Sequence, residues 1–282
     1  MIILNEVSAL KKVIDKAASE SRSIGFVPTM GALHAGHLSL ISSAKKSTDL
    51  TICSIFVNPV QFNDPKDYEK YPVTIEKDVE FLENAGTDFL FLPSVSEMYP
   101  GGVKNLEHYD LGYLESILEG KYRPGHFQGV AQVMARLLDF TEPDQLFMGQ
   151  KDYQQCMVVQ KLIETKKLRT KLVICPTIRE QDGLAMSSRN LRLNSEERKK
   201  AAAIYETLRF VKENVSAGDL AHLEIEASMK LSARGFKVDY IEIAKADDLQ
   251  LLNEWNGMDK LVILTAAFLN EIRLIDNILI DA

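Results

Sequence analysis

Two histidines three residues apart are the first residues in this sequence that could do chemistry. His34 and His37 lie between an apolar run at residues 24–27 and a helix-like run at residues 38–46. The pattern predicts a strand that ends where a helix begins, with both imidazoles on one face of the helix start. Unpaired backbone N–H groups and the helix dipole favour an anion such as phosphate there. A structural turn with locally hydrogen-bonded histidines is the alternative, and the strand–loop–helix context favours binding.

Polar residues also follow other predicted strands, at the edge of an α/β sheet where ligands bind. Gln61 follows the second predicted strand, and Lys151 and Gln155 follow the fourth. Lys151 can neutralise phosphate charge, and Gln155 lies about one helical turn further on. By position alone, Gln61 is more typical of a surface loop, and the Gly-x-Lys-Asp pattern at residues 149–152 is a weak signal.

Two donor-rich segments have more than one reading. Ser187, Ser188 and Arg189 follow the fifth predicted strand, and hydroxyls with a guanidinium are the donors that a triphosphate needs. A polar loop that caps the next helix is the alternative. Residues 118–127 are predicted as a loop, in which Arg123 and His126 either face solvent or reach a phosphate or carboxylate.

The order of the elements predicts two domains. Strands expected at residues 24–28, 50–57, 89–92, 145–148 and 172–175 alternate with helices. This alternation is typical of an α/β fold, a Rossmann-like doubly wound parallel sheet. In the last third of the chain, helices expected at 194–214 and 220–234 precede strands expected at 237–244, 260–269 and 271–280. We therefore expect domain 1–178 and a smaller α+β C-terminal domain, 179–282.

The composition is that of an ordinary globular protein. The 282 residues are 46% hydrophobic and 26% charged, and the net charge of −7 argues against nonspecific binding to nucleic acid or an anionic membrane. No apolar run approaches the roughly 20 residues that span a bilayer, and the first residues lack the pattern of a secretory signal. The cysteines Cys53, Cys156 and Cys175 are typical of buried thiols in a reducing compartment. We expect a cytoplasmic protein.

Several common catalytic patterns do not occur in the sequence. It contains no Gly-x-Gly-x-x-Gly, no Walker motif, no zinc-ligand spacing and no Gly-x-Ser-x-Gly. What remains is a set of His, Lys, Ser and Arg phosphate donors without an obvious covalent nucleophile. Such a set suits attack of a substrate carboxylate on a nucleotide α-phosphorus, which depends on positioning and charge stabilisation.

His34-Ala35-Gly36-His37 resembles the His-x-Gly-His motif of the nucleotidyltransferase superfamily. The longer run from Pro28 to His37 is similar to that of the pantothenate synthetase (pantoate–β-alanine ligase) family. The resemblance implies that ATP activates pantoate as a pantoyl adenylate with release of pyrophosphate, and that the amine of β-alanine then displaces AMP. It also implies Mg²⁺ and a homodimer. Residues 187–189 resemble the mobile second motif of the superfamily.

The resemblance assigns roles to residues of this chain. It implies catalytic and phosphate contacts from His34, His37, Lys151, Ser187, Ser188 and Arg189. His37 is the family's usual acid candidate, and we expect it chiefly to stabilise the transition state by hydrogen bonding. Gln61 and Gln155 are expected to bind pantoate, and Gln61 also β-alanine. The implied ATP site consists of Met30, Gly31, Ala32, Leu33, His34, Ala35, Gly36, His37, Gly149, Gln150, Lys151, Asp152, Ile178, Met186, Ser187, Ser188 and Arg189.

Two positions depart from the family pattern. Gln150 stands where many relatives carry Glu, and Lys77 lies between Glu76 and Asp78 where some relatives have consecutive acids near Mg²⁺. We therefore assign no protein ligand to the metal and expect ATP oxygens and water to hold it. The implied domain roles are nucleotide and pantoate binding for the first domain and closure over ATP for the second.

Two other functions compete with the ligase. One is a nucleotidyltransferase of the same superfamily that leaves AMP or CMP on its product. The other is a noncatalytic nucleotide-sensing or RNA-binding module with the same fold. The net negative charge of the chain and the full set of phosphate donors disfavour the noncatalytic module.

Overall fold

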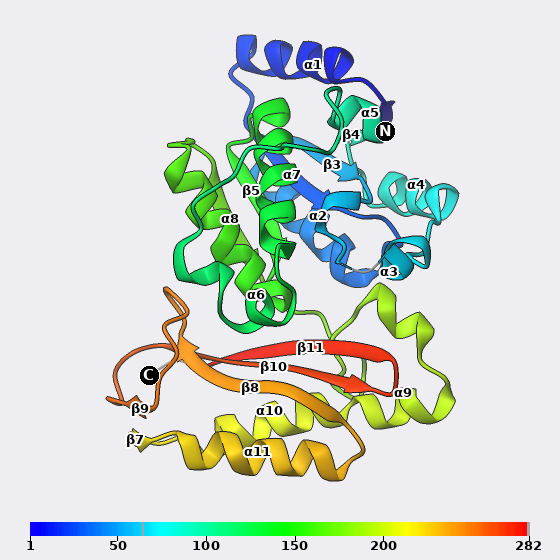
Figure 1. The fold of residues 1–282 in the computed structure, drawn as a ribbon. Coiled ribbons are helices and arrows are strands. Elements are labelled where there is room, and N and C mark those ends of the chain that lie inside the picture. The colour runs from blue at the N-terminus through cyan, green and yellow to red at the C-terminus, as the bar shows by residue number, and fades with distance from the viewer. Residues whose placement is uncertain (64, 281–282) are drawn as a thin grey trace. The chain divides into compact units, whose positions relative to one another are not determined.

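The computed structural model describes residues 1–63 and 65–280 and divides into two compact units (Figure 1). The first unit consists of Met1–Gly149 and Gln155–Pro176, and the second of Gln150–Gln154 and the chain from Thr177 onward. The main change of unit therefore comes after Pro176. The short segment Gln150–Gln154, which the sequence placed in the first domain, belongs to the second unit.

Six parallel strands form the sheet of the first unit, in the order β1-β4-β3-β2-β5-β6. From β2 the chain proceeds to one side through β3 and β4, and it then continues on the other side with β5 and β6. The winding reverses between β2 and β5, which is where ligands bind in such folds. The predicted Rossmann-like doubly wound sheet is confirmed. The strands are β1 (Ile2–Leu4), β2 (Ile24–Thr29), β3 (Leu50–Ile55), β4 (Phe89–Phe91), β5 (Gln145–Gly149) and β6 (Lys171–Cys175).

This sheet has one strand more than the five predicted. Strand β1 pairs in parallel with β4, but it has only three residues, and Ile2 and Ile3 are exposed. So short an edge strand lacks the buried apolar run on which the prediction relied.

Helices α2, α4, α7 and α8 lie around the sheet in Figure 1. Helix α2 packs on β2, β3 and β5 and buries Leu40, Ile41 and Ala44. The helices and 3-10 turns of this half of the chain are α1 (Val7–Ser19), α2 (Ala35–Ser47), η1 (Pro59–Gln61), α3 (Pro65–Glu69), α4 (Ile75–Asn84), α5 (Val95–Met98), η2 (Gly112–Glu115), α6 (Leu118–Tyr122), α7 (His126–Thr141), η3 (Gln150–Asp152) and α8 (Tyr153–Thr165).

The prediction of a loop over residues 118–127 is wrong. The segment forms α6, a short turn at residues 123–125 and the first residues of α7. Helix α6 packs so closely on the preceding turn that a Cβ at Gly120 would lie 2.3 Å from the carbonyl oxygen of Glu115. Glycine weakens a helix by itself, and here tertiary packing outweighs that preference.

The second unit has a three-stranded antiparallel sheet in the order β11-β10-β8. Helices α10 and α11 run along this sheet (Figure 1) and bury Leu208 and Leu231 with Ile243 and Ile263. The predicted α+β domain is confirmed, although the helix expected at 194–214 is interrupted at Ala202. The elements are η4 (Ser188–Arg192), α9 (Ser195–Ala201), α10 (Ala203–Asn214), β7 (Gly218–Asp219), α11 (Ala221–Ala233), β8 (Lys237–Lys245), β9 (Glu254–Trp255), β10 (Leu261–Leu269) and β11 (Ile272–Ile280).

The three cysteines are buried, as the composition predicts. Cys53, Cys156 and Cys175 are buried cysteines, and burial raises the pKa of Cys53 to about 12. In the part of the chain that the structure describes, no helix combines the length and apolarity needed to cross a bilayer.

Candidate active site

The two histidines cap the start of α2 through their Nδ1 atoms. Nδ1 of His34 accepts the backbone N–H of Gly36 at 3.1 Å, and Nδ1 of His37 accepts the backbone N–H of His34 at 3.3 Å. The bonds form a reciprocal cap, with the ring centroids 4.1 Å apart. Because each Nδ1 accepts a hydrogen bond, the proton of each neutral imidazole lies on Nε2.

Asp78 of α4 holds the loop that precedes this cap. Its carboxylate is 1% exposed and accepts the backbone N–H of Ala32 at 2.9 Å and that of Leu33 at 2.8 Å. The hydroxyl of Thr74 donates to both carboxylate oxygens. At Gly31 the φ angle is +80°, and a Cβ there would lie 3.1 Å from Asp78 Oδ2, so the turn requires glycine. This role of Asp78 was not evident from the sequence.

Gln61 lies in η1, directly after β3 and its short connection. Its Nε2 donates to Met30 Sδ at 3.2 Å, and its Oε1 accepts from Asn58 Nδ2 at 3.1 Å. Asn58 is 1% exposed, donates also to the carbonyl of Gly129 and accepts from the hydroxyl of Tyr99. Burial raises the pKa of Tyr99 to about 12, so this hydroxyl stays protonated as a donor. Asn58 therefore orients Gln61, a second role that the sequence analysis did not assign.

Arg123 and His126 form part of the packing around Gln61. Nδ1 of His126 lies 2.8 Å from the backbone oxygen of Gln61, and Nε2 lies 3.1 Å from Nη1 of Arg123. Arg123 is also 3.9 Å from the carboxylate of Glu119. His126 and Glu119 are buried, so a solvent-exposed turn does not describe this segment.

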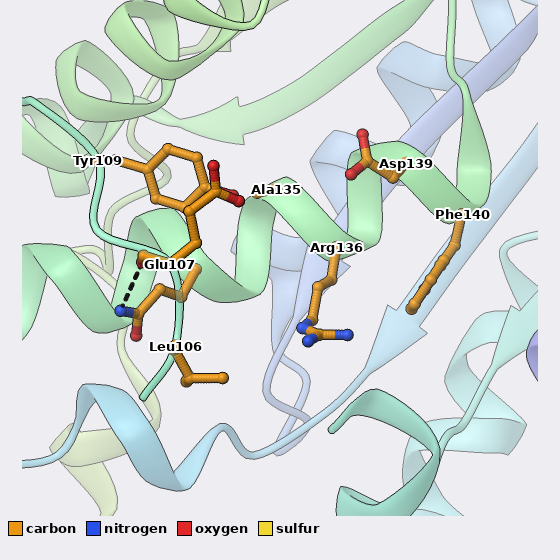
Figure 2. Close-up of a pocket in the computed structure, with 8 residues that line it drawn as sticks. Leu106, Glu107, Tyr109, Ala135, Arg136, Asp139 and Phe140 are labelled. Carbon is orange, nitrogen blue, oxygen red and sulfur yellow. Dashed lines mark hydrogen bonds between the residues drawn. The ribbon is translucent and has the colours of Figure 1, made fainter. Parts of the chain in front are cut away.

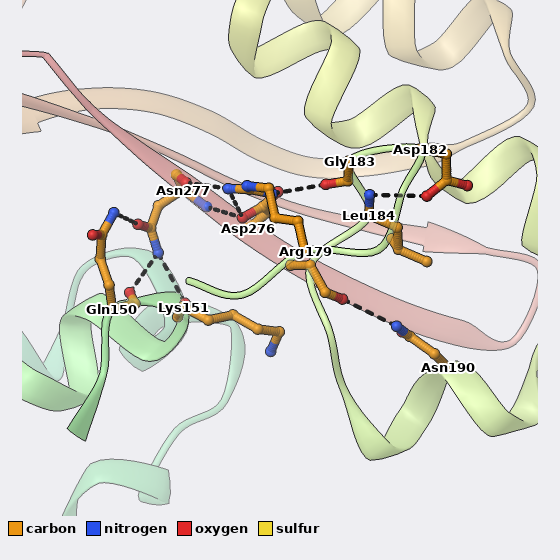
Figure 3. Close-up of polar contacts among 10 residues, drawn as sticks. Gln150, Lys151, Arg179, Asp182, Gly183, Leu184, Asn190, Asp276 and Asn277 are labelled. Atoms are coloured by element: carbon orange, nitrogen blue, oxygen red, sulfur yellow. Dashed lines mark hydrogen bonds and ion pairs between the residues drawn. The ribbon is translucent and has the colours of Figure 1, made fainter. Parts of the chain in front are cut away.

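Lys151 lies in turn η3 of the second unit. Its side chain is 19% exposed, and Nζ lies 3.9 Å from Oδ1 of Asp152. The main-chain carbonyls of Gln150 and Lys151 both accept hydrogen bonds from Nδ2 of Asn277, at 2.8 and 2.9 Å (Figure 3). The backbone on which Lys151 is carried is thus bound to strand β11.

Residues 187–189 follow a hairpin that joins Ile178 to Met186. The N–H of Met186 donates to the carbonyl of Ile178 at 3.0 Å, so these two predicted ATP-site residues are neighbours. Oγ of Ser187 accepts the backbone N–H of Arg189 and caps η4, while Ser188 is buried.

The predicted site residues fall in both units. The first unit contains Gly149 and Gln155 together with the β2 loop and Gln61, and the second contains residues 150–152, Ile178 and residues 186–189. Within the first unit the two histidines are adjacent and Gln61 contacts Met30. Gln155 lies in the first turn of α8.

A cavity of about 250 Å³ lies beside the C-terminal half of α7 (Figure 2). Figure 2 shows Arg136 and Asp139 on the helix and Glu107 and Tyr109 on the segment beside it. The predicted site residues are not among the described residues that line it. No group of three His, Cys, Asp or Glu side chains suited to a metal ion occurs among the residues that the structure describes.

The fold and the loop after β2 together define a class of protein. A doubly wound parallel sheet, with a His-Ala-Gly-His helix start where its winding reverses, is the arrangement of the nucleotidyltransferase superfamily. The family model described as pantoate-beta-alanine ligase matches residues 2–279. The chain belongs to this family.

Similar proteins match over essentially the whole chain. A pantothenate synthetase of Caldicellulosiruptor bescii is 42% identical and covers 100% of both chains. The crystal structure of a pantothenate synthetase from Thermus thermophilus matches with a TM-score of 0.89 and 38% identity, covering 99% of both chains. A pantoate-beta-alanine ligase from Francisella tularensis, complexed with beta-gamma ATP and beta-alanine, has a TM-score of 0.83 and 39% identity, covering 99% of this chain and 97% of that one.

Proposed function

We propose that this protein is an ATP-dependent ligase that condenses pantoate with β-alanine to pantothenate, with release of AMP and pyrophosphate. The observation that carries the proposal is the His34–His37 cap at the carboxyl end of β2, in a chain that the family model matches from residue 2 to 279. The Francisella tularensis relative, whose structure contains an ATP compound and β-alanine, supports the same substrates here.

In the proposed first step, a carboxylate oxygen of pantoate attacks the α-phosphorus of ATP. An O–P bond forms, the bond to the β-phosphate oxygen breaks, and pyrophosphate leaves. The chain's part is to hold the reactants in line and to donate hydrogen bonds to phosphoryl oxygens as charge develops. The Nε2–H groups of His34 and His37, Nζ of Lys151, and the donors of residues 187–189 have this role.

In the second step, the amine of β-alanine attacks the carbonyl carbon of the pantoyl adenylate. A C–N bond forms, the nitrogen gives up a proton to solvent, the C–O bond to the phosphate breaks, and AMP leaves with the oxygen that came from pantoate. The Gln61 amide suits the substrate side of this site because an amide can donate to a carboxylate and accept from a hydroxyl. We propose the same contact to pantoate for Gln155.

Magnesium is proposed only as part of the ATP complex. The described acidic residues do not gather into a ligand set, and both oxygens of Asp78 already accept hydrogen bonds from the β2 loop or from Thr74. Phosphate oxygens and water satisfy the octahedral preference of Mg²⁺ without such a set. Bound in this way, the ion neutralises phosphate charge.

A homodimer and a cytoplasmic location are also proposed, in keeping with the family resemblance. Sedimentation of the purified protein tests the first. We expect a mass near twice 31.7 kDa, and a mass of 31.7 kDa at working concentration would reject the dimer.

Identification of the nucleotide products tests the proposed reaction. We expect ATP, pantoate and β-alanine to give AMP, pyrophosphate and pantothenate in equal amounts, with turnover only when both acceptors are present. A product that retains the nucleotide would support a nucleotidyltransferase instead. Absence of AMP with every carboxylate tried, alongside tight binding of nucleotide or RNA, would favour the noncatalytic module.

A further inference from the structure

Two adjacent residues of β11 contact both segments of the second unit that carry nucleotide-site residues. Asp276 and Asn277 are 3% and 1% exposed. Figure 3 shows Asn277 directed at Gln150 and Lys151, and Asp276 directed at Arg179. One dipeptide of β11, an edge strand of the three-stranded sheet, thus holds the turn of Lys151 and the hairpin that leads to residues 187–189.

Asn277 uses its whole amide to hold the Lys151 turn. Nδ2 donates to the carbonyls of Gln150 and Lys151 at 2.8 and 2.9 Å, and Oδ1 accepts from Nε2 of Gln150 at 3.1 Å. With three hydrogen bonds inside the protein, the orientation of the amide is fixed, and so is the main chain of two consecutive residues. This contact leaves the Lys151 amine itself uninvolved and acts only on the backbone that carries it.

Asp276 holds the hairpin through Arg179. Nη1 and Nη2 of Arg179 donate to the two carboxylate oxygens at 2.6 and 3.0 Å, in a bidentate pair. The same guanidinium donates to the carbonyl of Gly183 at 3.0 Å and stacks on the ring of Tyr205 at 3.9 Å. A Cβ at Gly183 would lie 2.1 Å from that ring, so glycine is required for the hairpin to pack there.

We propose that Asn277 is a positioning residue that sets the place of the Lys151 amine relative to residues 187–189. The cations and hydroxyls that bind the triphosphate are thereby held in place before ATP binds. This inference rests on the proposed use of ATP. Asp276 and Arg179 hold the hairpin that leads to residues 187–189. The segment Gln150–Gln154, which carries Lys151, belongs to the same compact unit as residues 187–189.

The substitution Asn277→Asp tests the inference without changing the size of the side chain. It places a carboxylate oxygen against two carbonyl oxygens that now accept from Nδ2, and it therefore releases the turn. Asn277→Ala removes the bonds without adding charge and serves if the first variant does not fold. Asn214→Asp is the matched control, since Asn214 is exposed at the end of α10 and donates to the carbonyl of Phe210, one turn earlier on the same helix.

Two readouts are needed, one physical and one kinetic. In the free protein, we expect amide hydrogen exchange at residues 150–155 to be faster in Asn277→Asp and unchanged in Asn214→Asp. In pantoate-dependent exchange of pyrophosphate into ATP, we expect kcat/KM for ATP to fall about 100-fold, with KM for pantoate unchanged. In a protein that already carries Lys151→Ala, Asn277→Asp should lower kcat/KM for ATP by less than about a further 3-fold, since Asn277 acts through Lys151.

Each contrary result has a separate meaning. Unchanged amide hydrogen exchange at residues 150–155 would overturn the positioning role of Asn277. An equal loss of kcat/KM for ATP in the presence and absence of the Lys151 side chain would also overturn it. If the wild-type protein does not exchange pyrophosphate with pantoate but hydrogen exchange responds as expected, the proposed function fails and the positioning of Lys151 for ATP fails with it, while the anchoring contact stands.

Discussion

His34 and His37 each have two nitrogens with separate tasks. The Nδ1 atoms accept backbone N–H groups and stabilise the start of α2, whereas Nε2 carries the proton that is proposed to reach phosphate. A histidine in this cap is therefore a structural residue and a donor at the same time. Substitutions can separate these tasks because an asparagine side chain places its acceptor oxygen about where Nδ1 lies.

We expect His37→Asn to keep the helix cap and to lose most of the rate of adenylate formation. Removal of one transition-state donor typically costs about 100- to 1,000-fold in rate, and both His37→Asn and His37→Ala should show this loss in pyrophosphate exchange. Only His37→Ala should also lose about 1 kcal/mol of stability in urea unfolding, because the cap bond is lost. Wild-type rates for His37→Asn would show that capping is the whole role of this residue.

Asp78 is expected to matter for stability and for ATP use together. In Asp78→Asn, one carboxylate oxygen becomes an NH₂ group that faces a backbone N–H of the β2 loop, so a buried donor is left unsatisfied at a cost of about 1–3 kcal/mol. Urea unfolding should show this loss, and KM for ATP should rise. Glu76→Gln, an exposed change of the same charge on the same helix, is the control. Equal stability of both variants would contradict the account.

At the scale of elements, helix α11 meets strand β8 through a carboxyl group. Oε1 of Glu224 accepts the backbone N–H of Ile243 at 2.8 Å. Burial raises the pKa of Glu224 to about 7, and the nearby carboxylates of Glu242 and Asp219 add to the shift. The folded protein therefore holds this proton more tightly than the unfolded chain does. The contribution to stability is complete below the unfolded pKa of 4.5 and is lost as pH rises to about 7.

We therefore expect Glu224→Gln to stabilise the second unit at high pH only. The amide oxygen still accepts from Ile243, and no charge has to be buried, so the variant should exceed wild type by about 1–2 kcal/mol at pH 8 and match it near pH 4.5. Guanidinium unfolding at the two pH values measures this difference, with Glu226→Gln on the same helix as control. A stability difference that does not depend on pH would refute the assignment.

The elements themselves show what could be predicted from the sequence. Strands β2, β3, β5 and β10 are mainly apolar runs, and the alternation of strand and helix was enough to predict the doubly wound sheet. Strand β1 was missed because it is short and exposed, and helix α6 was missed because it contains a glycine. Both elements become ordered only through tertiary contacts.

The candidate site could be proposed from the sequence where it consists of a local motif. The His-Ala-Gly-His start and the Ser-Ser-Arg run could be found from spacing, but Asn58, Asp78 and Asn277 act across long sequence separations. Asp78 left one signal, since it interrupts the apolar stripe formed by Ile75, Val79 and Leu82 on α4. Asn277, buried in the final strand, left none that periodicity alone could show.

At the scale of the whole molecule, residues proposed to bind one ATP belong to two compact units. We propose that the second unit closes over the nucleotide, and we expect ATP with pantoate to slow amide hydrogen exchange in the segment of Ser187 to Arg189 by at least about 10-fold. Amides of strand β10, in the core of the second unit, are the internal control. Equal exchange with and without ATP would contradict closure of the second domain over the nucleotide.

The central claim is that a carboxylate oxygen of pantoate attacks the α-phosphorus of ATP. Pantoate labelled with ¹⁸O in its carboxylate tests it most directly, with mass analysis of the nucleotide after complete turnover with β-alanine. The account predicts one ¹⁸O in AMP and none in pyrophosphate, because the C–O bond breaks when the amine attacks. Unlabelled AMP, or ADP formed with labelled inorganic phosphate, would contradict it.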